Sequence, residues 1–542
     1  MLRRIILAVL LLAVMVIAIW RTLPPAALPA GAPAEAFSAG RAAETIRAIA
    51  RSPRLVGSPA YETARYYLLM QMAALGLTTE TQDLAMQGAW VENTLGRLEG
   101  RSSREAILLV AHLDSVAETP GAMDNASGVA EVLEMVRALK AGPELENTII
   151  VLFSGPEENC CYGARAFAKR HPWAKDVRLV VNVDAGGVSG PSILAATGPE
   201  EGWLIREMAQ VLPDPIGSSA IEAFGNPATD YSLELRQDGF SGFDFNLSWV
   251  KRIHTPLDNV DHLNLASIQH QGEHMLAVVR HFGNISLDYP REPRPVYFDL
   301  LGLTLVNYPV SLVIPLFLGL VLIMSAALFL GFQRKALTMR GMAFGGLAFL
   351  LSLLTVPLLL MLIQLAIIQP LLATGRGAGL SNQLTGDSLL SNSLRWGSLI
   401  FALPATGLWF AYFRKVKRVE LDELVSGTYI LLFAGAGVTS LAFPAISYLF
   451  LWALLFGLTA LALQFSMKAE SSQVREWIHL VATIAAAVVS ILLFVPGILM
   501  ATMSIDIRMI YLVPVLVTAM AGSLIAPLGE FRTVIFAQEM PK

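Results

Sequence analysis

Charged residues are scarce in this chain of 542 residues, where they make up 15% of the sequence. An ordinary soluble domain has about 25%. Hydrophobic residues make up 54%, so we infer that much of the chain lies in lipid. The net charge is only −4. This small imbalance gives no sign of a polyanionic partner, and we expect no binding to nucleic acid.

Cysteine is almost absent, with two residues in the whole chain, Cys160 and Cys161. The two are neighbours in sequence, and neighbouring cysteines rarely reach the geometry of a disulfide bond. We therefore expect no disulfide framework. The cellular compartment cannot be read from cysteine usage.

The apolar residues gather at the start of the chain and in its second half. Residues 5–20 form an uninterrupted apolar run behind Arg3 and Arg4, which is typical of a signal anchor or a signal peptide. We favour an anchor, although APA at 32–34 could be a cleavage site. From about residue 298 we count seven further apolar segments, at about 306–332, 341–369, 395–413, 424–443, 447–467, 477–499 and 509–528.

Basic residues orient these predicted spans. By the positive-inside rule, the basic loops and the Arg3–Arg4 pair are cytoplasmic. Eight spans then leave both termini in the cytoplasm and residues 39–285 on the other side. The spans hold almost no ionisable residue, which favours an anchor or scaffold over a transporter. The basic loops contain Arg334, Lys335 and Arg340, then Arg414, Lys415, Lys417 and Arg418, then Lys468 and Arg475.

The Ala/Leu/Arg-rich style of the sequence suggests a bacterial inner-membrane protein. Residues 39–285 would then face the periplasm, and a eukaryotic lumen would be topologically equivalent.

Residues 39–285 alternate strand-like apolar runs at 106–111, 148–153 and 178–183 with helical stretches. This alternation predicts an α/β domain with a mostly parallel central sheet covered by helices. The helical stretches are 62–75, 127–140 and 161–171.

The predicted parts of the chain are an anchor at 1–22, a Pro/Ala linker at 23–38, the α/β domain at 39–290, an all-α transmembrane domain of seven helices at 298–530 and a cytoplasmic tail at 531–542.

Carboxylates follow each of the three predicted strands, and a histidine also follows the first. His112 and Asp114 come after the first, Glu157 and Glu158 after the second, and Asp184 ends the third. Taken singly, each could be an ordinary polar turn or a solvated loop. Because the carboxyl ends of parallel strands meet at one edge of a sheet, we expect these side chains to lie together. The set predicts a metal site.

Two more residues could complete this site. Asp124 opens DNASG before a predicted helix, where it could cap the helix, but a carboxylate can also bridge two metals. His254 lies in the loop IHTP. Together these residues would suit two zinc ions. His270 and His274 are four residues apart but lack the Glu of the metalloprotease helix motif, so we expect them on the surface.

In this order, the motifs AHLDS, MDNASG, GPEEN, NVDAG and IHTP resemble the co-catalytic dizinc aminopeptidase family. That family includes bacterial leucyl aminopeptidases, glutamate carboxypeptidase II and glutaminyl cyclases. With its short anchor and its multi-span C-terminal half, the chain looks like the endoplasmic reticulum metallopeptidase and vacuolar membrane protease branch. The motifs cover about residues 40–285.

The resemblance implies a ligand set for two zinc ions per chain. His112 and Asp184 would bind one zinc, Glu158 and His254 would bind the other, and Asp124 would bridge the two. It also implies the activity of a membrane-anchored exopeptidase that removes N-terminal residues from peptides outside the cytosol.

Further roles follow from the same resemblance. Glu157 matches the general base that acts on a zinc-bridging water, and Asp114 matches the residue that orients His112. The bond between Asp124 and Asn125 would be cis. ATDYSL at 228–233 resembles a stretch near the substrate pocket of the family, so Asp230 could line that pocket or cap a helix.

Other functions stay open on the sequence alone. A glutaminyl cyclase or a carboxypeptidase could use the same scaffold, and cyclases of this family work with one zinc. A receptor or scaffold with a protease-like ectodomain would bind without catalysis, although such proteins lose ligands and this chain keeps every expected one. A membrane sensor is a further alternative. Oligomeric state cannot be read from the sequence.

Overall fold

The computed structural model of the chain describes residues 2–102, 104–225, 227–250, 252–368, 370, 389–466, 473–504 and 507–525. It divides the chain into two compact units, one formed by residues 21–307 and the other by residues 1–20 with 308–542. The expected tail at 531–542 lies outside the described residues.

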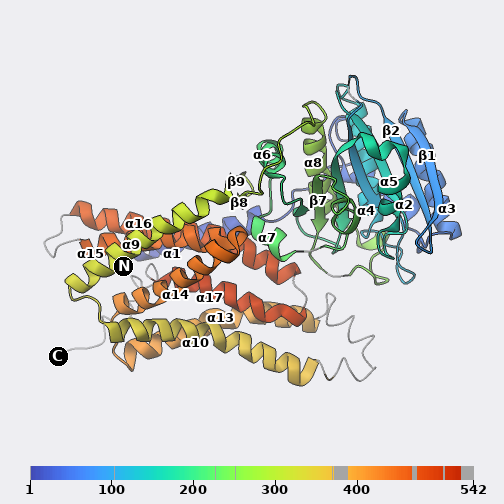
Figure 1. Cartoon of the computed structure of the whole chain (residues 1–542). Coiled ribbons are helices and arrows are strands. Elements are labelled where there is room, and N and C mark those ends of the chain that lie inside the picture. The colour runs from blue at the N-terminus through green and yellow to red at the C-terminus, as the bar shows by residue number, and fades with distance from the viewer. Residues whose placement is uncertain are drawn as a thin grey trace. The chain divides into compact units, whose positions relative to one another are not determined.

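Residues 21–307 are built on a seven-stranded mixed sheet with the strand order β1-β2-β4-β3-β5-β7-β6 (Figure 1). The four central strands, β4, β3, β5 and β7, pair in parallel, and the edge strands pair antiparallel. The mostly parallel sheet predicted from the sequence is therefore confirmed at its centre. The strands are β1 (Thr78–Met86), β2 (Ala89–Leu98), β3 (Ala106–His112), β4 (Thr148–Ser154), β5 (Val177–Ala185), β6 (Ile193–Thr197) and β7 (Gly242–Leu247).

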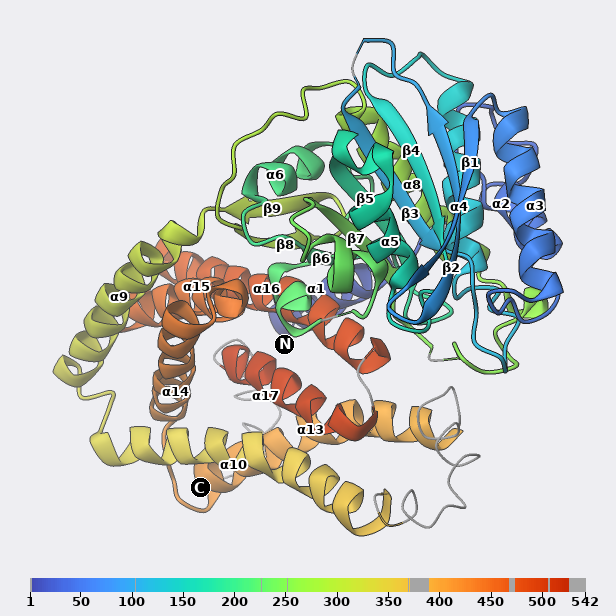
Figure 2. The same ribbon diagram turned by 45° about the vertical axis from the view of Figure 1, so that its right-hand side comes forward.

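Helices cover both faces of this sheet (Figure 2). From β3, Ile107 and Leu109 pack in a core with α2, α3, α4 and α8, whereas Leu108 and Val110 pack with α5 and the π-helical turn η2. Every residue of β3 is buried, which is why the strand has no polar alternation. The helical elements are α2 (Ala39–Ile49), α3 (Pro59–Ala74), α4 (Ala126–Lys140), α5 (Tyr162–Arg170), η1 (Pro172–Asp176), α6 (Gly202–Val211), α7 (Ser219–Phe224), η2 (Asp230–Leu235), η3 (Val260–His262) and α8 (Leu265–Phe282). A short ribbon, β8 (Val296–Leu300) and β9 (Thr304–Tyr308), follows.

The other unit is helical. In it, α10 packs against α13 and α14, and α15 packs against α9 and α16. Large apolar side chains remain exposed, with Leu322 and Leu408 each 72% accessible, as expected for surfaces that face lipid. The elements are α1 (Leu2–Arg21), η4 (Val310–Leu312), α9 (Val313–Gln333), α10 (Met339–Ile363), η5 (Gln364–Ile368), α13 (Leu389–Lys415), α14 (Leu421–Ala442), η6 (Pro444–Ile446), α15 (Ser447–Ser466), α16 (Gln473–Ser504), η7 (Ile507–Leu512) and α17 (Val513–Ser523).

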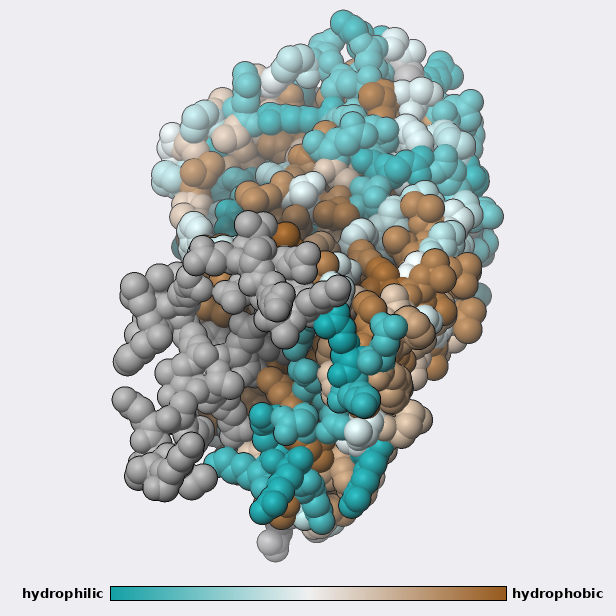
Figure 3. Space-filling view, turned by 90° about the vertical axis from the view of Figure 1, so that its left-hand side faces the viewer, coloured by the Kyte–Doolittle hydropathy of each residue, from teal (hydrophilic) through white to brown (hydrophobic). Residues whose placement is uncertain are grey.

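The loops between α9 and α10 and between α13 and α14 lie at the same end of the helical unit (Figure 1). Figure 3 looks onto this end of the helical unit. Hydrophilic residues gather there, and hydrophobic residues lie beside them.

The expected count of eight spans is wrong for the described residues, because six helices are long and apolar enough to cross a membrane. At the other two expected spans, the described residues contain the shorter apolar stretches Leu7–Arg21 and Met509–Ser523, each of 10–17 residues. The six candidate spans are Val310–Gln333, Met339–Ala366, Asn392–Lys415, Leu421–Ala442, Pro444–Ser466 and Trp477–Ser504.

Candidate metal centre

The carboxyl ends of the central strands bring the predicted residues to one edge of the sheet. His112 is the last residue of β3, Asp184 is the last but one of β5, and Glu157 and Glu158 follow β4. Because β3, β4 and β5 are parallel, these side chains emerge on the same side.

Loops supply the two remaining residues. Asp124 directly precedes Asn125, whose side chain accepts a hydrogen bond from the N–H of Gly128 and so caps α4. The bond between Asp124 and Asn125 is cis. His254 lies in the loop after β7, with a backbone φ of 57° and half of its side chain exposed.

The first donor group is buried and contains His112, Asp124 and Asp184. Nε2 of His112 lies 3.2 Å from Oδ1 of Asp124 and 3.5 Å from Oδ1 of Asp184. The second group contains Asp124, Glu158 and His254. Nε2 of His254 lies 3.1 Å from Oδ2 of Asp124 and 3.2 Å from Oε2 of Glu158. Asp124 therefore turns one carboxylate oxygen to each group.

These separations fit zinc. With bonds of about 2.0–2.2 Å, a tetrahedral zinc ion holds its donor atoms about 3.3–3.6 Å apart. Here each histidine nitrogen lies 3.1–3.5 Å from the two carboxylate oxygens of its group. Moreover, Oε1 of Glu158 is buried and has no hydrogen-bond partner among the described residues. A buried carboxylate oxygen without a partner is costly, and a cation would relieve that cost.

Asp114 joins the ends of two strands. Its carboxylate accepts hydrogen bonds from the backbone N–H of Glu157, at 3.0 and 3.1 Å, and from that of Glu158, at 3.1 Å. Nδ1 of His112 lies 3.1 Å from the main-chain oxygen of Asp114 and 3.6 Å from its carboxylate. If Nδ1 donates to that carbonyl, Nε2 is left with a free lone pair directed at the first donor group.

Burial and the surrounding carboxylates both raise the pKa of Glu157. Burial raises the pKa of Glu157 well above its usual range; His112 opposes the shift, and Asp184, Asp230 and Asp114 add to it. Oε1 of Glu157 accepts a hydrogen bond from the thiol of Cys161 at 3.4 Å, while Oε2 lies 4.0 Å from Nε2 of His112. The second oxygen is therefore the one that faces the donor groups.

The pKa values of the two histidines are also raised, whereas that of Asp124 is lowered. Burial works to lower the pKa of His112, but Glu157 and the other surrounding carboxylates raise it well above its usual value. Hydrogen bonds with Asp124 and Glu158 raise the pKa of His254 to about 10. Burial alone would raise the pKa of Asp124, yet its contacts with both histidines lower it to about 2. The site holds a surplus of negative charge that would attract divalent cations.

Asp230 lies at the start of η2 and is 2% exposed. One of its oxygens accepts a hydrogen bond from the hydroxyl of Ser154, and the other has no partner among the described residues. Burial raises the pKa of Asp230 to about 7, against the effect of the Ser154 hydrogen bond. Its predicted place in a substrate pocket stays a prediction.

Two residues that the sequence analysis missed hold the segment before Asp124. Asp258 accepts hydrogen bonds from the backbone N–H of Met123 at 2.7 Å and of Asp124 at 3.1 Å. Arg54 is fully buried and donates to the carbonyls of Leu113, Pro120 and Gly121. The spacing of Asp258, four residues after His254 in HTPLD, was the available signal.

His270 and His274 are buried, so the expectation that they lie on the surface is wrong. Nε2 of His270 lies 3.0 Å from the carbonyl oxygen of Asp214, and Nε2 of His274 lies 2.8 Å from that of Pro213. Their rings pack edge to face, 4.1 Å apart. Neither residue belongs to the donor groups found among the described residues.

Residues 93–279 match the model of Peptidase family M28. The chain carries a Peptidase family M28 domain. The family predicted from the motifs is thereby confirmed, and the matched region holds every residue of the two donor groups.

Similar proteins include an endoplasmic reticulum metallopeptidase and a vacuolar membrane protease. The chain is 33% identical to endoplasmic reticulum metallopeptidase 1 of Mus musculus over 44% of its own length and 28% of the mouse protein. It is 27% identical to the vacuolar membrane protease of Schizosaccharomyces japonicus over 53% of its own length and 36% of that protein. The chain therefore spans about a third or less of these relatives.

Among solved structures, an aminopeptidase from Aneurinibacillus sp. strain AM-1 matches with a TM-score of 0.39 and 15% identity, over 48% of this chain and 98% of that one. A Porphyromonas gingivalis glutaminyl cyclase matches with a TM-score of 0.38 and 18% identity, over 45% and 98%.

Proposed function

We propose that this chain is a membrane-anchored, zinc-dependent aminopeptidase with two zinc ions in its M28 domain. The observation that carries the proposal is the position of Asp124, whose two oxygens face two separate donor groups. In the proposal, His112 and Asp184 hold one zinc with Asp124, and Glu158 and His254 hold the other with the same Asp124.

Glu157 is the proposed general base. When bound, zinc would polarise the scissile carbonyl and lower the pKa of the attacking water. Glu157 takes the proton of that water and passes it to the leaving amine. Its Oε2 faces the donor groups while its Oε1 contacts Cys161, and its raised pKa suits a group that must hold a proton during the reaction.

Asp114 is the proposed positioning residue. By accepting hydrogen bonds from the N–H groups of Glu157 and Glu158, it fixes the base and a ligand of the second group together. The nearby main-chain oxygen of the same residue fixes the ring of His112. Asp114 thus links all three parts of the site.

A free amino terminus is the proposed recognition element of the substrate. Carboxylates crowd the site, and two buried carboxylate oxygens, on Glu158 and Asp230, have no hydrogen-bond partner among the described residues. A protonated or metal-bound amine would suit this surplus of negative charge, which favours cleavage of N-terminal residues.

The M28 domain is proposed to lie outside the cytosol. The exposed basic residues between α9 and α10 and between α13 and α14 share one end of the helical unit (Figure 1). By the positive-inside rule that end is cytoplasmic. The periplasm of a bacterium, or a lumen, would then hold the peptides that the enzyme cleaves.

The deciding experiment compares the purified full-length chain with its Glu157→Gln variant on peptides with free and with acetylated amino termini. Glu44→Gln, an exposed change on α2, is the matched control. We expect cleavage of free termini alone, a loss of about 10²–10⁴-fold in rate for Glu157→Gln, and two zinc ions per chain in all three proteins. Near-normal turnover in Glu157→Gln would reject the base, and a single zinc would favour the cyclase alternative.

A further inference from the structure

A second cleft opens in the compact unit of residues 21–307, at the opposite edge of the sheet from the metal centre. It lies beside the first residues of β5 and just before β7, has a volume of about 320 Å³, and is lined by Val177, Arg178, Asp238, Gly239, Phe240, Ser241, Leu287, Asp288, Tyr289 and Arg291. Asp184 of the metal centre lies seven residues further along β5 than Val177. At about 3.3 Å per residue the two sites are roughly 23 Å apart, so the cleft is separate from the proposed chemistry.

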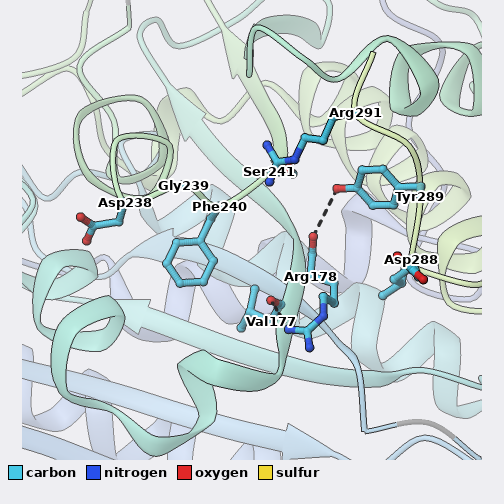
Figure 4. Close-up of a pocket in the computed structure, with 10 residues that line it drawn as sticks. Val177, Arg178, Asp238, Gly239, Phe240, Ser241, Asp288, Tyr289 and Arg291 are labelled. Carbon is cyan, nitrogen blue, oxygen red and sulfur yellow. Dashed lines mark hydrogen bonds between the residues drawn. The ribbon is translucent and has the colours of Figure 1, made fainter.

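The walls of this cleft are fixed in place. The ring of Tyr289 stacks on Trp203 with centroids 5.0 Å apart and 7° between the planes, and its hydroxyl donates to the carbonyl of Arg178 at 3.3 Å. Figure 4 shows Tyr289 and Arg291 reaching in from one side and Phe240 from the other. Val177 and Leu287 are buried and form an apolar floor.

Two of the four charged side chains on the lining are already paired. Arg178 donates to the carbonyls of Lys175 and Val177 and lies 3.6 Å from Glu105. Asp238 pairs with Lys169. These groups have little left to offer a ligand.

Of the two arginines on the lining, Arg291 is the one without a partner among the described residues. Its side chain is exposed, and the described residues supply no hydrogen bond or ion pair to its guanidinium. It ends beside Ser241 and the Tyr289 hydroxyl (Figure 4). A guanidinium suits a carboxylate because its N–H groups match two oxygens at once.

We propose that this cleft binds a carboxylate carried on a small apolar body, with Arg291 as its anchor. Phe240, Val177 and Leu287 would cover the apolar part. The carboxylate of Asp288 on the rim would repel a multiply charged anion such as phosphate more strongly than a single carboxylate. Clefts of about 300 Å³ lie at the small end of ligand sites, which favours one ring or one side chain. The carboxylate could belong to a free organic acid or to the C-terminus of a peptide.

The test is a saturation-transfer NMR titration of the full-length protein in detergent, with phenylacetate as the probe. Phenylacetamide lacks the charge, inorganic phosphate lacks the apolar body, and N-acetyl-Gly-Phe presents the carboxylate of a peptide terminus. The variants are Arg291→Gln, Arg291→Lys and the exposed control Arg47→Gln on α2.

We expect saturable binding of phenylacetate to the wild type and to Arg47→Gln, at least fivefold weaker binding to Arg291→Gln, and intermediate binding to Arg291→Lys. Unchanged thermal midpoints and zinc content would show that the variants are folded. Tighter binding of N-acetyl-Gly-Phe would identify a peptide terminus as the source, and binding of phenylacetate alone would identify a free acid.

Other outcomes would overturn the proposal. Equal binding to Arg291→Gln would put the carboxylate elsewhere, for example at the metal centre. Equal binding of phenylacetamide would mean that charge is not recognised, and equal binding of phosphate would make the cleft an inorganic anion site. A wild type that binds none of the probes would leave the cleft without this function. None of these readouts measures peptidase activity. The test of this cleft is therefore independent of the proposed catalysis.

Discussion

At the scale of single residues, the supports around a metal site matter nearly as much as its ligands. Asp258 is 1% exposed, and its two oxygens accept from the N–H groups of Met123 and Asp124. Asp258→Ala would leave both donors buried and unpaired, at about 1–3 kcal/mol each, and would free the proposed bridging ligand. Changes of this kind typically cost about 10–100-fold in metal affinity or activity.

Zinc affinity, measured by chelator competition, checks this prediction. We expect a loss within that range for Asp258→Ala and a smaller one for Asp258→Asn, because the amide oxygen still accepts one hydrogen bond. Asp261→Asn, an exposed change in the next turn, should behave as wild type. Wild-type zinc affinity in Asp258→Ala would show that the backbone around Asp124 keeps its position without the hydrogen bonds to Asp258.

Residues at strand ends could be predicted from the sequence, whereas their supports could not. His112, Glu157, Glu158 and Asp184 each follow a continuous apolar run, and the geometry of parallel strands brings such positions together. Arg54 and Asp258 lie in loops with no periodic pattern. Their hydrogen-bond partners are mostly backbone groups up to 135 residues away in the chain. Local sequence patterns do not predict contacts over such separations.

At the scale of elements, α8 carries two buried histidines that make the domain sensitive to acid. Burial lowers the pKa of His270 to about 4, although the carbonyl and carboxylate of Asp214 oppose the shift, and it lowers that of His274 well below its usual value. Between pH 6.5, the usual value in an unfolded chain, and pH 4, the unfolded chain binds protons that the folded one does not. The free energy of unfolding should therefore fall as the pH drops through this range.

Thermal unfolding of the wild type and of His270→Gln between pH 4 and pH 8 checks this. For His270, the difference between the two pKa values corresponds to roughly 3 kcal/mol. We expect the variant to be less stable at pH 7 but to lose less stability on acidification. Carboxylates with raised pKa values contribute equally to both proteins and cancel in the comparison. Parallel pH profiles would contradict the assignment.

Helix α8 also packs tightly against the segment before α2. A Cβ added at Gly272 would lie 2.1–2.3 Å from ring atoms of Phe37, and both residues are buried. Overpacking of this kind costs about 1–3 kcal/mol, so Gly272→Ala should lower the thermal midpoint by several degrees. Gly142→Ala, where the nearest atom is 3.6 Å away, is the control. Restoration by Phe37→Leu would confirm the contact as the cause, and an unchanged midpoint in Gly272→Ala would reject it.

The sequence predicted the strands that are continuous apolar runs, but it did not predict the strands at the edges of the sheet. The runs at 106–111, 148–153 and 178–183 match β3, β4 and β5, because buried parallel strands are apolar on both faces. The antiparallel strands β1 and β2 carry mixed polar residues and gave no such signal. The polar neighbours of His270 and His274 suggested a surface, yet α8 is buried on most sides.

At the scale of the whole molecule, composition predicted a membrane half but overstated its spans. Apolar content identifies lipid-facing segments, but among the described residues only six helices are both long and apolar enough to cross a membrane, and Leu7–Arg21 and Met509–Ser523 are shorter apolar stretches. Helix α1 shares a compact unit with residues from 308 onward. Whether short helices contribute spans depends on their neighbours, which composition does not record.

The native cysteines offer a direct test of the proposed orientation. Cys160 is exposed on the M28 domain, while Cys161 is buried and burial raises the pKa of its thiol, so a membrane-impermeant maleimide should modify Cys160 alone. In spheroplasts of a bacterial host, we expect labelling of the wild type and none of Cys160→Ser. Lys417→Cys, placed in the Cys160→Ser background, puts the thiol on an exposed basic loop and should react only after lysis. Because the positive-inside rule assigns that loop to the cytoplasm, labelling of Lys417→Cys in intact spheroplasts, with protection of Cys160, would invert the orientation and place the proposed peptidase in the cytosol.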